Sequence, residues 1–226
     1  METLQRFLYY PINQLPYVIF ALIVAFTVHE FSHAFVAYKF GDPTAKNQGR
    51  LTLNPAVHLD PIGTILIFIA GLGWAKPVPV NYFFFKNKRL AGVLVSIAGP
   101  ISNLLVATIA MGLWFALDAI GILAQLSARA IDVLIPLFTI LINLNVVLFI
   151  FNLIPLPPLD GYRVIEDLAP SQVRSKLIQY EHYSLFIFLI LFITPVGDFV
   201  FGSIFDIIQP IIFNSLENLF LFIFSL

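Results

Sequence analysis

Six stretches of this chain consist mostly of apolar residues, and short polar connections separate them. A helix needs about 20 such residues to cross a bilayer. The stretches are Leu15–Tyr38, Ile62–Trp74, Leu90–Leu117, Val133–Ile154, Ser184–Ile193 and Phe199–Leu226. The second and the fifth are short for a spanning helix. The pattern therefore predicts an all-α polytopic membrane protein with about five to six membrane segments.

The second apolar stretch has the residues of a loop rather than those of a helix. Pro61 and Gly63 open it, and it runs into a Pro-Val-Pro-Val stretch at residues 77–80. Prolines at alternate positions suit an extended strand whose N–H edge is unpaired. Irregular backbone at membrane depth has to be sheltered by protein. We therefore expect a re-entrant loop or β-hairpin after the first segment.

The composition supports a membrane protein. Of 226 residues, 59% are hydrophobic and 11% are charged, whereas a soluble domain has about 25% charged residues. At this length we expect a single domain over residues 1–226, with the lipid bilayer as its surroundings. The net charge of −1 gives no reason to expect a nucleic-acid partner. Because there is no cysteine, a transition metal would need histidine and carboxylate ligands.

The basic residues predict the orientation in the membrane. If the second stretch only dips into the bilayer and the others cross it, ten of the twelve Lys and Arg residues lie on one face. Positively charged loops face the cytoplasm, so we expect this face to be cytoplasmic, in a plasma or inner membrane. Arg6 and Arg129 remain for the other face. The ten are Lys39, Lys46, Arg50, Lys76, Lys86, Lys88, Arg89, Arg163, Arg174 and Lys176.

The first apolar stretch contains an HExxH sequence, His29 to His33. Two histidines four residues apart share one helix face and can bind one zinc ion, and Glu30 can act as the base that deprotonates water. The alternative is that these are buried polar residues that pair with other helices. Ionisable residues inside a bilayer cost several kcal/mol, roughly, unless they are paired or functional. His33 lies about 8 Å from the inner end of the helix, which predicts an active site near the cytoplasmic face.

A third zinc ligand should come from another segment that ends on the same face. Asn152 and Asp160 lie in the sequence NLIPLPPLDG, at the end of the fourth stretch. The three prolines end the helix, and Gly161 would let the backbone turn after Asp160. Asp160 could then reach the metal. The alternative is an ordinary loop aspartate at the water interface.

Together, HExxH and N-x-x-P-x-x-x-L-D-G on separate membrane segments resemble the site-2 protease family of intramembrane zinc metalloproteases, in its compact bacterial-type branch. The resemblance implies that His29, His33 and Asp160 bind one Zn²⁺ per chain and that Glu30 is the catalytic base. It also implies that Asn152 positions substrate or stabilises the oxyanion. Asn143 and Asn145, on the same segment, are suited to hydrogen bonds between helices.

The function that follows is hydrolysis of peptide bonds in or near transmembrane segments of membrane proteins, in regulated intramembrane proteolysis. An edge strand could bind an unwound substrate by β-augmentation. The residues expected to bind substrate in this way are Trp74, Lys76, Pro77, Val78, Pro79, Val80 and Asn81. The alternatives are a zinc or ion transporter and a non-catalytic relative that binds membrane proteins.

The remaining histidines and one asparagine have weaker predictions. His58 could pair with Asp60 behind the metal site or compete with Asp160 as a ligand, but an anchor for the loop is the preferred reading. Asn103 could line the same cavity, although small residues before it equally suit close helix packing. His182 is read as an interfacial side chain.

Overall fold

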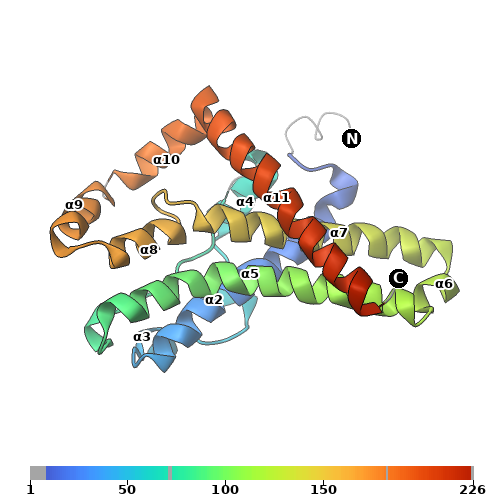
Figure 1. The fold of residues 1–226 in the computed structure, drawn as a ribbon, viewed down its shortest axis with the longest axis horizontal. Coiled ribbons are helices and arrows are strands. Elements are labelled where there is room, and N and C mark those ends of the chain that lie inside the picture. The colour runs from blue at the N-terminus through green and yellow to red at the C-terminus, as the bar shows by residue number, and fades with distance from the viewer. Residues whose placement is uncertain (1–8, 71–72, 182, 225–226) are drawn as a thin grey trace.

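The computed structural model describes residues 9–70, 73–181 and 183–224. Within them, four helical stretches are long and apolar enough to cross a membrane. They are Ile12–Lys39, Lys88–Ala119, Ala128–Leu153 and Pro195–Phe224. The first comprises the short turn η1 (Ile12–Gln14) and helix α2 (Leu15–Lys39), and the others are α5, α7 and α11 (Figure 1). The chain is therefore an all-helical multi-pass membrane protein, with fewer candidate spans than the five to six expected.

Shorter helices and turns connect these four. The helices are α3 (Thr44–Asn47), α4 (Pro61–Ala70), α6 (Ile122–Gln125), α8 (Asp160–Leu168), α9 (Ser171–Glu181) and α10 (Ser184–Ile193). The turns are η2 (Pro55–Val57) and η3 (Tyr82–Phe84). Helix α10 occupies the fifth predicted stretch, and its ten residues rise only about 15 Å, half of a hydrocarbon core.

Helices α2, α5 and α7 form the centre of the molecule, and α11 crosses over α5 and α7 (Figure 1). Small residues allow the close approach of helices that membrane packing requires. Ala107 and Ala110 of α5 lie in one buried cluster with Ile142 and Val146 of α7. On α2, four alanines are fully buried: Ala21, Ala25, Ala34 and Ala37.

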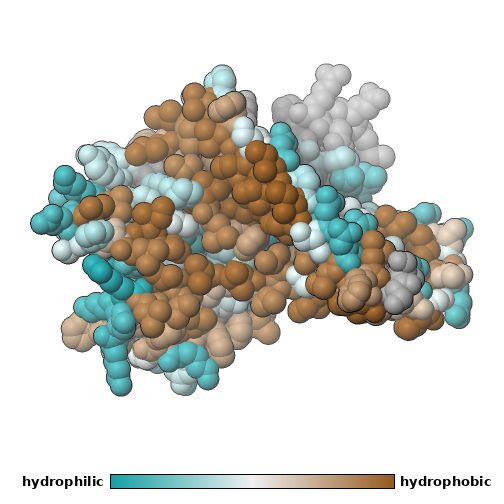
Figure 2. All heavy atoms as spheres, in the orientation of Figure 1, coloured by the Kyte–Doolittle hydropathy of each residue, from teal (hydrophilic) through white to brown (hydrophobic). Residues whose placement is uncertain are grey.

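Polar elements lie at the two ends of this bundle. Figure 1 shows α3, α8, α9 and the start of α5 at one end, and α6 at the other. In Figure 2 the surface between the ends is largely hydrophobic, and hydrophilic residues gather toward the ends. The basic residues of α3, α8 and α9 thus share one end, as the orientation argument requires, while Arg129 begins α7 at the opposite end. Which end faces the cytoplasm stays a prediction.

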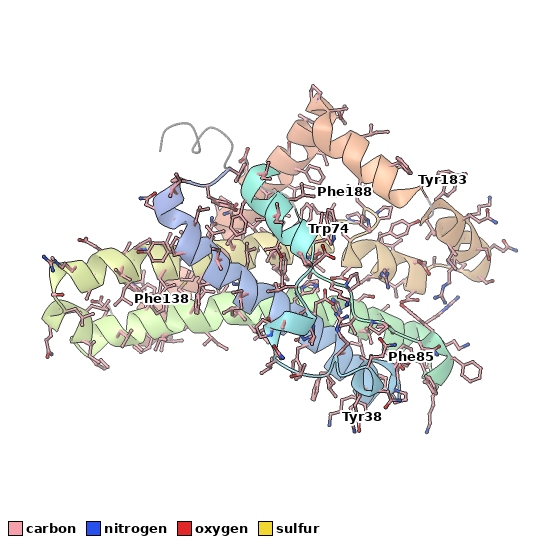
Figure 3. The ribbon with its side chains drawn as sticks, turned by 180° about the vertical axis from the view of Figure 1, so that it is seen from behind. Tyr38, Trp74, Phe85, Phe138, Tyr183 and Phe188 are labelled. Atoms are coloured by element: carbon pink, nitrogen blue, oxygen red, sulfur yellow. The ribbon has the colours of Figure 1, made fainter. Side chains whose placement is uncertain are left out.

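The segment that comprises residues 61–81 differs in part from the expected loop or hairpin. Its first half is helix α4, whose Ile67 packs into the same cluster as Val18 and Leu22 of α2 (Figures 1 and 3). The second half, residues 73–81, is extended, but the described part of the chain has only one isolated bridge, Leu59 to Ala75, and no strand. A ladder cannot continue because the prolines at 77 and 79 have no N–H to donate. Insertion of this segment into the membrane stays a prediction.

Candidate metal centre

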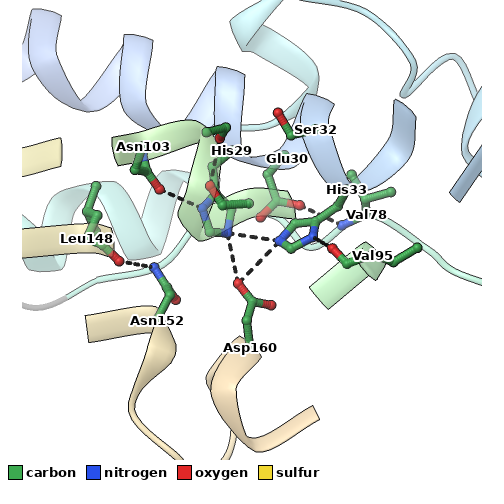
Figure 4. A network of polar contacts seen from close by, with 12 residues as sticks. His29, Glu30, Ser32, His33, Val78, Val95, Asn103, Leu148, Asn152 and Asp160 are labelled. Carbon is green, nitrogen blue, oxygen red and sulfur yellow. Dashed lines mark hydrogen bonds and ion pairs between the residues drawn. The ribbon is translucent and has the colours of Figure 1, made fainter. Parts of the chain in front are cut away.

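Two imidazoles of α2 and one carboxylate at the start of α8 converge on one point (Figure 4). His29 and His33 lie one turn apart on α2, and their Nε2 atoms are 3.0 Å apart. Asp160 Oδ2 lies 3.2 Å from His29 Nε2 and 3.3 Å from His33 Nε2. The structure thus brings together the three residues that the sequence predicts as metal ligands.

The loop between α7 and α8 places Asp160. Helix α7 ends at Leu153, and Asp160 is the first residue of α8, so its carboxylate lies at a helix N-terminus. Gly161 does not provide the expected turn, because it lies inside α8 and has no positive φ. Its role is close approach: a Cβ there would lie 2.3 Å from the Leu153 carbonyl oxygen. Any side chain at residue 161 would push α8 away from α7, and Asp160 with it.

The hydrogen bonds of the imidazoles decide which nitrogen faces the centre. His33 Nδ1 lies 2.7 Å from the Val95 carbonyl oxygen, which can only accept. Nδ1 of His33 therefore carries the hydrogen, and its Nε2 presents a lone pair. His29 is held in the same sense by Asn103, whose Oδ1 is 2.7 Å from His29 Nδ1.

With both rings neutral, the centre therefore presents three electron-pair donors to one another. Asp160 Oδ2 is buried, and both Nε2 atoms lie close to it. Such an arrangement is repulsive unless a cation, either a metal ion or a proton on one imidazole, lies between the donors. Two imidazole nitrogens and one carboxylate oxygen form the ligand set of a catalytic zinc site, which leaves a fourth position open. The residues present fit a zinc ion.

Glu30 lies beside this centre without belonging to the ligand group. It is buried, and its Oε2 accepts a hydrogen bond of 2.8 Å from the backbone N–H of Val78. The extended segment therefore contacts the carboxylate that the sequence predicts as the base. Figure 4 shows Glu30 on α2 between the two histidines, with Val78 approaching from the connecting segment.

A cavity of about 550 Å³ opens onto the centre. Most of the extended segment that was predicted to bind substrate forms part of its wall. Trp74, Pro77, Val78 and Val80 line the cavity together with His29, Glu30, His33, Asn152 and Asp160. Lys76, Pro79 and Asn81 are not among the lining residues, and the side chains of Lys76 and Asn81 are exposed.

Asn152 lines the cavity but makes its hydrogen bond within its own helix. Its Nδ2 donates to the Leu148 carbonyl oxygen at 2.9 Å. An amide nitrogen carries two hydrogens, so this bond leaves one for another acceptor. Arg163 of α8 also lines the cavity, a position that sequence reasoning missed.

Two side chains and one backbone carbonyl from the preceding loops fix the extended segment. Arg50 donates to the Lys76 carbonyl oxygen at 2.6 Å, and Lys76 N donates to the His58 carbonyl oxygen at 2.8 Å. Asp42, which is fully buried, accepts from Asn81 N at 2.6 Å. Sequence reasoning missed Arg50 and Asp42, because each lies in a polar loop and resembles a surface residue.

The other candidates fall outside the ligand group. His58 is fully buried, its Nε2 is 2.8 Å from the Thr52 carbonyl oxygen, and it anchors the loop. Asp60 binds the N–H of Gly63 at the start of α4 rather than the ring of His58. His182 lies outside the described residues.

Next to the cavity, a second polar cluster joins the turn η3, which follows the extended segment, to α8. Asp167 is 1% exposed and accepts from Arg174 Nη2 at 2.8 Å and from the Tyr82 hydroxyl at 3.0 Å. Burial raises the pKa of the Asp167 carboxyl, and the Tyr82 hydrogen bond and the Arg174 charge oppose that rise. Because Asp160 begins the same helix, this cluster also helps to fix its position.

Comparison with known proteins connects this geometry to an enzyme family. The model of peptidase family M50 matches residues 116–194, which include Asn152 and Asp160. The Bacillus subtilis (strain 168) protein named "Putative zinc metalloprotease YwhC" is 59% identical over 197 residues, 87% of this chain and 89% of that protein. The "Putative zinc metalloprotease Rip2" of Mycolicibacterium smegmatis is 30% identical over 195 residues, 81% of this chain and 71% of that protein. The protein of the same name from Mycobacterium tuberculosis H37Rv is 32% identical over 196 residues, 83% of this chain and 71% of that protein. No solved structure matches the chain.

Proposed function

The chain belongs to peptidase family M50, the site-2 protease family, and from that premise we propose that it hydrolyses peptide bonds in or next to transmembrane segments of other membrane proteins. It is an intramembrane zinc protease whose substrates are membrane proteins. The observation that supports hydrolysis at this site is the convergence of His29, His33 and Asp160 beside the buried carboxylate of Glu30.

We assign one zinc ion per chain to this centre, held by His29 Nε2, His33 Nε2 and a carboxylate oxygen of Asp160. Zinc in such a site polarises the scissile carbonyl and acidifies water to a pKa of about 7. His29, His33 and Asp160 line the cavity, so water and a substrate carbonyl can both reach the centre. Hydrogen bonds from His33 Nδ1 to Val95 and from His29 Nδ1 to Asn103 hold the two rings for this role.

Glu30 is the proposed general base. Its carboxylate accepts a proton from the attacking water and then donates that proton to the leaving amine. The Val78 N–H bonded to Oε2 orients the carboxylate and offsets part of the cost of burying it. Asn152 is proposed to donate its second amide hydrogen to the developing oxyanion, from the opposite wall of the cavity.

The extended segment, residues 74–81, is proposed to hold the substrate. A peptide bond within a transmembrane helix is shielded because its carbonyl is already hydrogen-bonded, so the substrate has to unwind first. An extended backbone beside the cavity can pair with the unwound strand. Replacing Pro77 and Pro79 by alanine should impair cleavage of a helical substrate more than cleavage of a short unstructured peptide. Equal loss for both substrates would contradict this role.

The location is proposed from charge: the centre lies at the basic end of the bundle, which we assign to the cytoplasmic side of the plasma membrane. A cysteine-accessibility experiment in intact cells tests this directly. A cysteine introduced for exposed Lys46 should react only with a reagent that crosses the membrane. Labelling by an impermeant reagent would reverse the assignment.

The experiment that tests the activity compares the wild type with Glu30→Gln and with Glu217→Gln. Glu217 is exposed on α11, far along the chain from the centre, and it receives the same substitution. Bound zinc and cleavage of a single-span model substrate are measured for each purified protein. We expect zinc in all three and a cleavage rate lower by about 10²–10⁴ in Glu30→Gln alone, because a general base contributes that much. Full cleavage by Glu30→Gln would reject the assignment, and zinc flux into liposomes that survives the substitution would indicate a transporter.

A further inference from the structure

Three buried side chains form a hydrogen-bonded chain that crosses the three central helices and ends at the metal centre; Figure 4 shows its last link, from Asn103 to His29. Asn145 of α7 accepts from Asn103 of α5, with Oδ1 and Nδ2 3.0 Å apart. Asn103 Oδ1 in turn lies 2.7 Å from His29 Nδ1 on α2. Both asparagines are fully buried. Neither belongs to the residues that line the cavity.

Backbone carbonyls fix the direction of every bond in this chain. Asn145 has a side-chain atom 2.8 Å from the Leu141 carbonyl oxygen, which only accepts, so that atom is the amide nitrogen. Its oxygen therefore faces Asn103, which must present its own nitrogen. The Ala25 carbonyl oxygen, 3.3 Å from the same nitrogen, requires the same orientation.

The orientation of the Asn103 amide fixes which nitrogen of His29 carries the hydrogen. Because the Asn103 nitrogen is committed to Asn145 and Ala25, its oxygen is the atom that faces the imidazole. His29 Nδ1 must then donate, and its hydrogen cannot move to Nε2 without leaving two acceptors in contact. In the neutral ring the Nε2 lone pair therefore points to Asp160 and His33. The tautomer that binds metal is set from α7, two side chains away from the ion.

We propose that Asn103 and Asn145 are positioning residues that hold His29 in its metal-binding tautomer, and that Asn145 acts through Asn103. The proposal deepens the proposed function, since it takes zinc as the ion. It differs from an ordinary helix-packing role because packing alone would not depend on which amide atom faces which neighbour. Asn143, two residues before Asn145, provides the comparison: it also bonds between helices, to Gln209 of α11 at 2.6 Å, but has no path to the centre.

The test uses the full-length protein and zinc itself. Each asparagine is replaced by leucine, which has a similar size but no hydrogen-bonding group. The zinc dissociation constant is measured by competition with a chromophoric chelator, and the unfolding midpoint of the metal-free protein is measured beside it. Partners behind a metal-binding histidine are worth about 10–100-fold in affinity. We expect a loss in that range for Asn103→Leu, a smaller loss for Asn145→Leu, and wild-type affinity for Asn143→Leu.

The double variant decides whether the two residues form one chain. If Asn145 acts through Asn103, then Asn103→Leu with Asn145→Leu binds zinc no more weakly than Asn103→Leu alone. The proposed relay, in which Asn145 acts through Asn103, would be overturned if the affinity losses of the two single variants multiplied in the double variant. It would also be overturned if Asn143→Leu and Asn145→Leu lost zinc affinity equally, each in proportion to its loss of stability. Wild-type affinity in Asn103→Leu would overturn it as well. If the wild type itself binds no zinc, the proposed function fails and the relay fails with it. Should Asn103→Leu not fold, the comparison of Asn145 with Asn143 still tests the relay.

Discussion

Helix α5 passes so close to the two imidazoles that even a methyl group on residue 99 would displace them. A Cβ at Gly99 would lie 2.3 Å from His33 Nε2 and 2.6 Å from His29 Nε2. Non-bonded heavy atoms need about 3.5 Å, so Gly99→Ala would move one or both rings by about 1 Å. Zinc sites tolerate ligand-distance errors of about 0.2 Å. The substitution should therefore remove the metal centre.

The same change should leave α5 itself at least as stable. Gly99 is inside a 32-residue helix, where alanine is favoured over glycine by about 0.5–1 kcal/mol. The damage caused by Gly99→Ala is thus confined to the two imidazole rings that face residue 99. A displacement of about 1 Å at a reacting centre costs about 10² in rate, and loss of the ion would cost more. We therefore expect the cleavage rate to fall by about 100-fold or more.

The matched control is Gly202→Ala, because a Cβ at residue 202 would meet nothing within 4 Å. Zinc per chain, the cleavage rate and the helical content by circular dichroism are measured for both variants. Gly99→Ala should keep its helical content and lose zinc and cleavage, while Gly202→Ala should match the wild type. Wild-type zinc affinity in Gly99→Ala would refute the packing argument.

Two further substitutions test how the extended segment is held. Asp42→Asn replaces a carboxylate that accepts hydrogen bonds from Thr44 and Asn81 with an amide that cannot satisfy both. The cost of about 1–3 kcal/mol should appear as a raised KM with unchanged zinc content. An unchanged KM would count against this role of Asp42. Tyr82→Phe removes a bond that opposes the raised pKa of Asp167. The folded state then keeps that proton to higher pH than the unfolded state does, so stability should fall more steeply as pH rises above about 4. Parallel curves of unfolding midpoint against pH for the variant and the wild type would contradict this.

Local spacing was enough to predict that His29 and His33 share one face of the first long helix. An i, i+4 pair of histidines shares a face on any helix, and the apolar residues around His29 and His33 identify that helix as buried in the membrane. The approximate extents of α2, α5, α7, α10 and α11 follow from runs of apolar residues in the same way, although α7 begins five residues and α11 four residues before the predicted stretch. The prediction of Asp160 needed the family resemblance, because nothing local shows how the loop after α7 folds back.

Polar residues inside α5 were harder to interpret because their roles depend on packing. Ser96, Gly99 and Asn103 recur at helical spacing, so they share one face, and that pattern is the signal that could have located the contact with α2. Sequence spacing does not show which residue of a 32-residue helix meets His29, since that depends on how the helices cross. Asn145 was expected to bond between helices, and it does so, but its partner was not predictable.

Of the two alternatives expected after the first segment, a re-entrant loop or a β-hairpin, the hairpin does not form in the described residues, and backbone chemistry explains why. Alternate prolines do keep residues 73–81 extended, but they also remove the donors that a second strand would need, so only the Leu59 bridge forms. The segment is instead fixed by Asp42, Arg50 and Glu30, which are distant in sequence and charged. Glu30 was expected inside the membrane, but Asp42 and Arg50 lie in loops, where charges are usually solvated, so nothing local indicates that these two would turn inward.

Neighbouring elements, rather than the sequence of α2 itself, explain why this helix tolerates three ionisable residues. Each would cost several kcal/mol, roughly, if left unpaired in a membrane. Glu30 takes its hydrogen bond from Val78, His33 gives one to Val95, and His29 is held by Asn103. All three partners belong to the extended segment and α5, so the polar face of α2 is stable only after both have docked. It follows that zinc binding depends on assembly of these elements, and α2 in isolation should not hold the ion at this affinity.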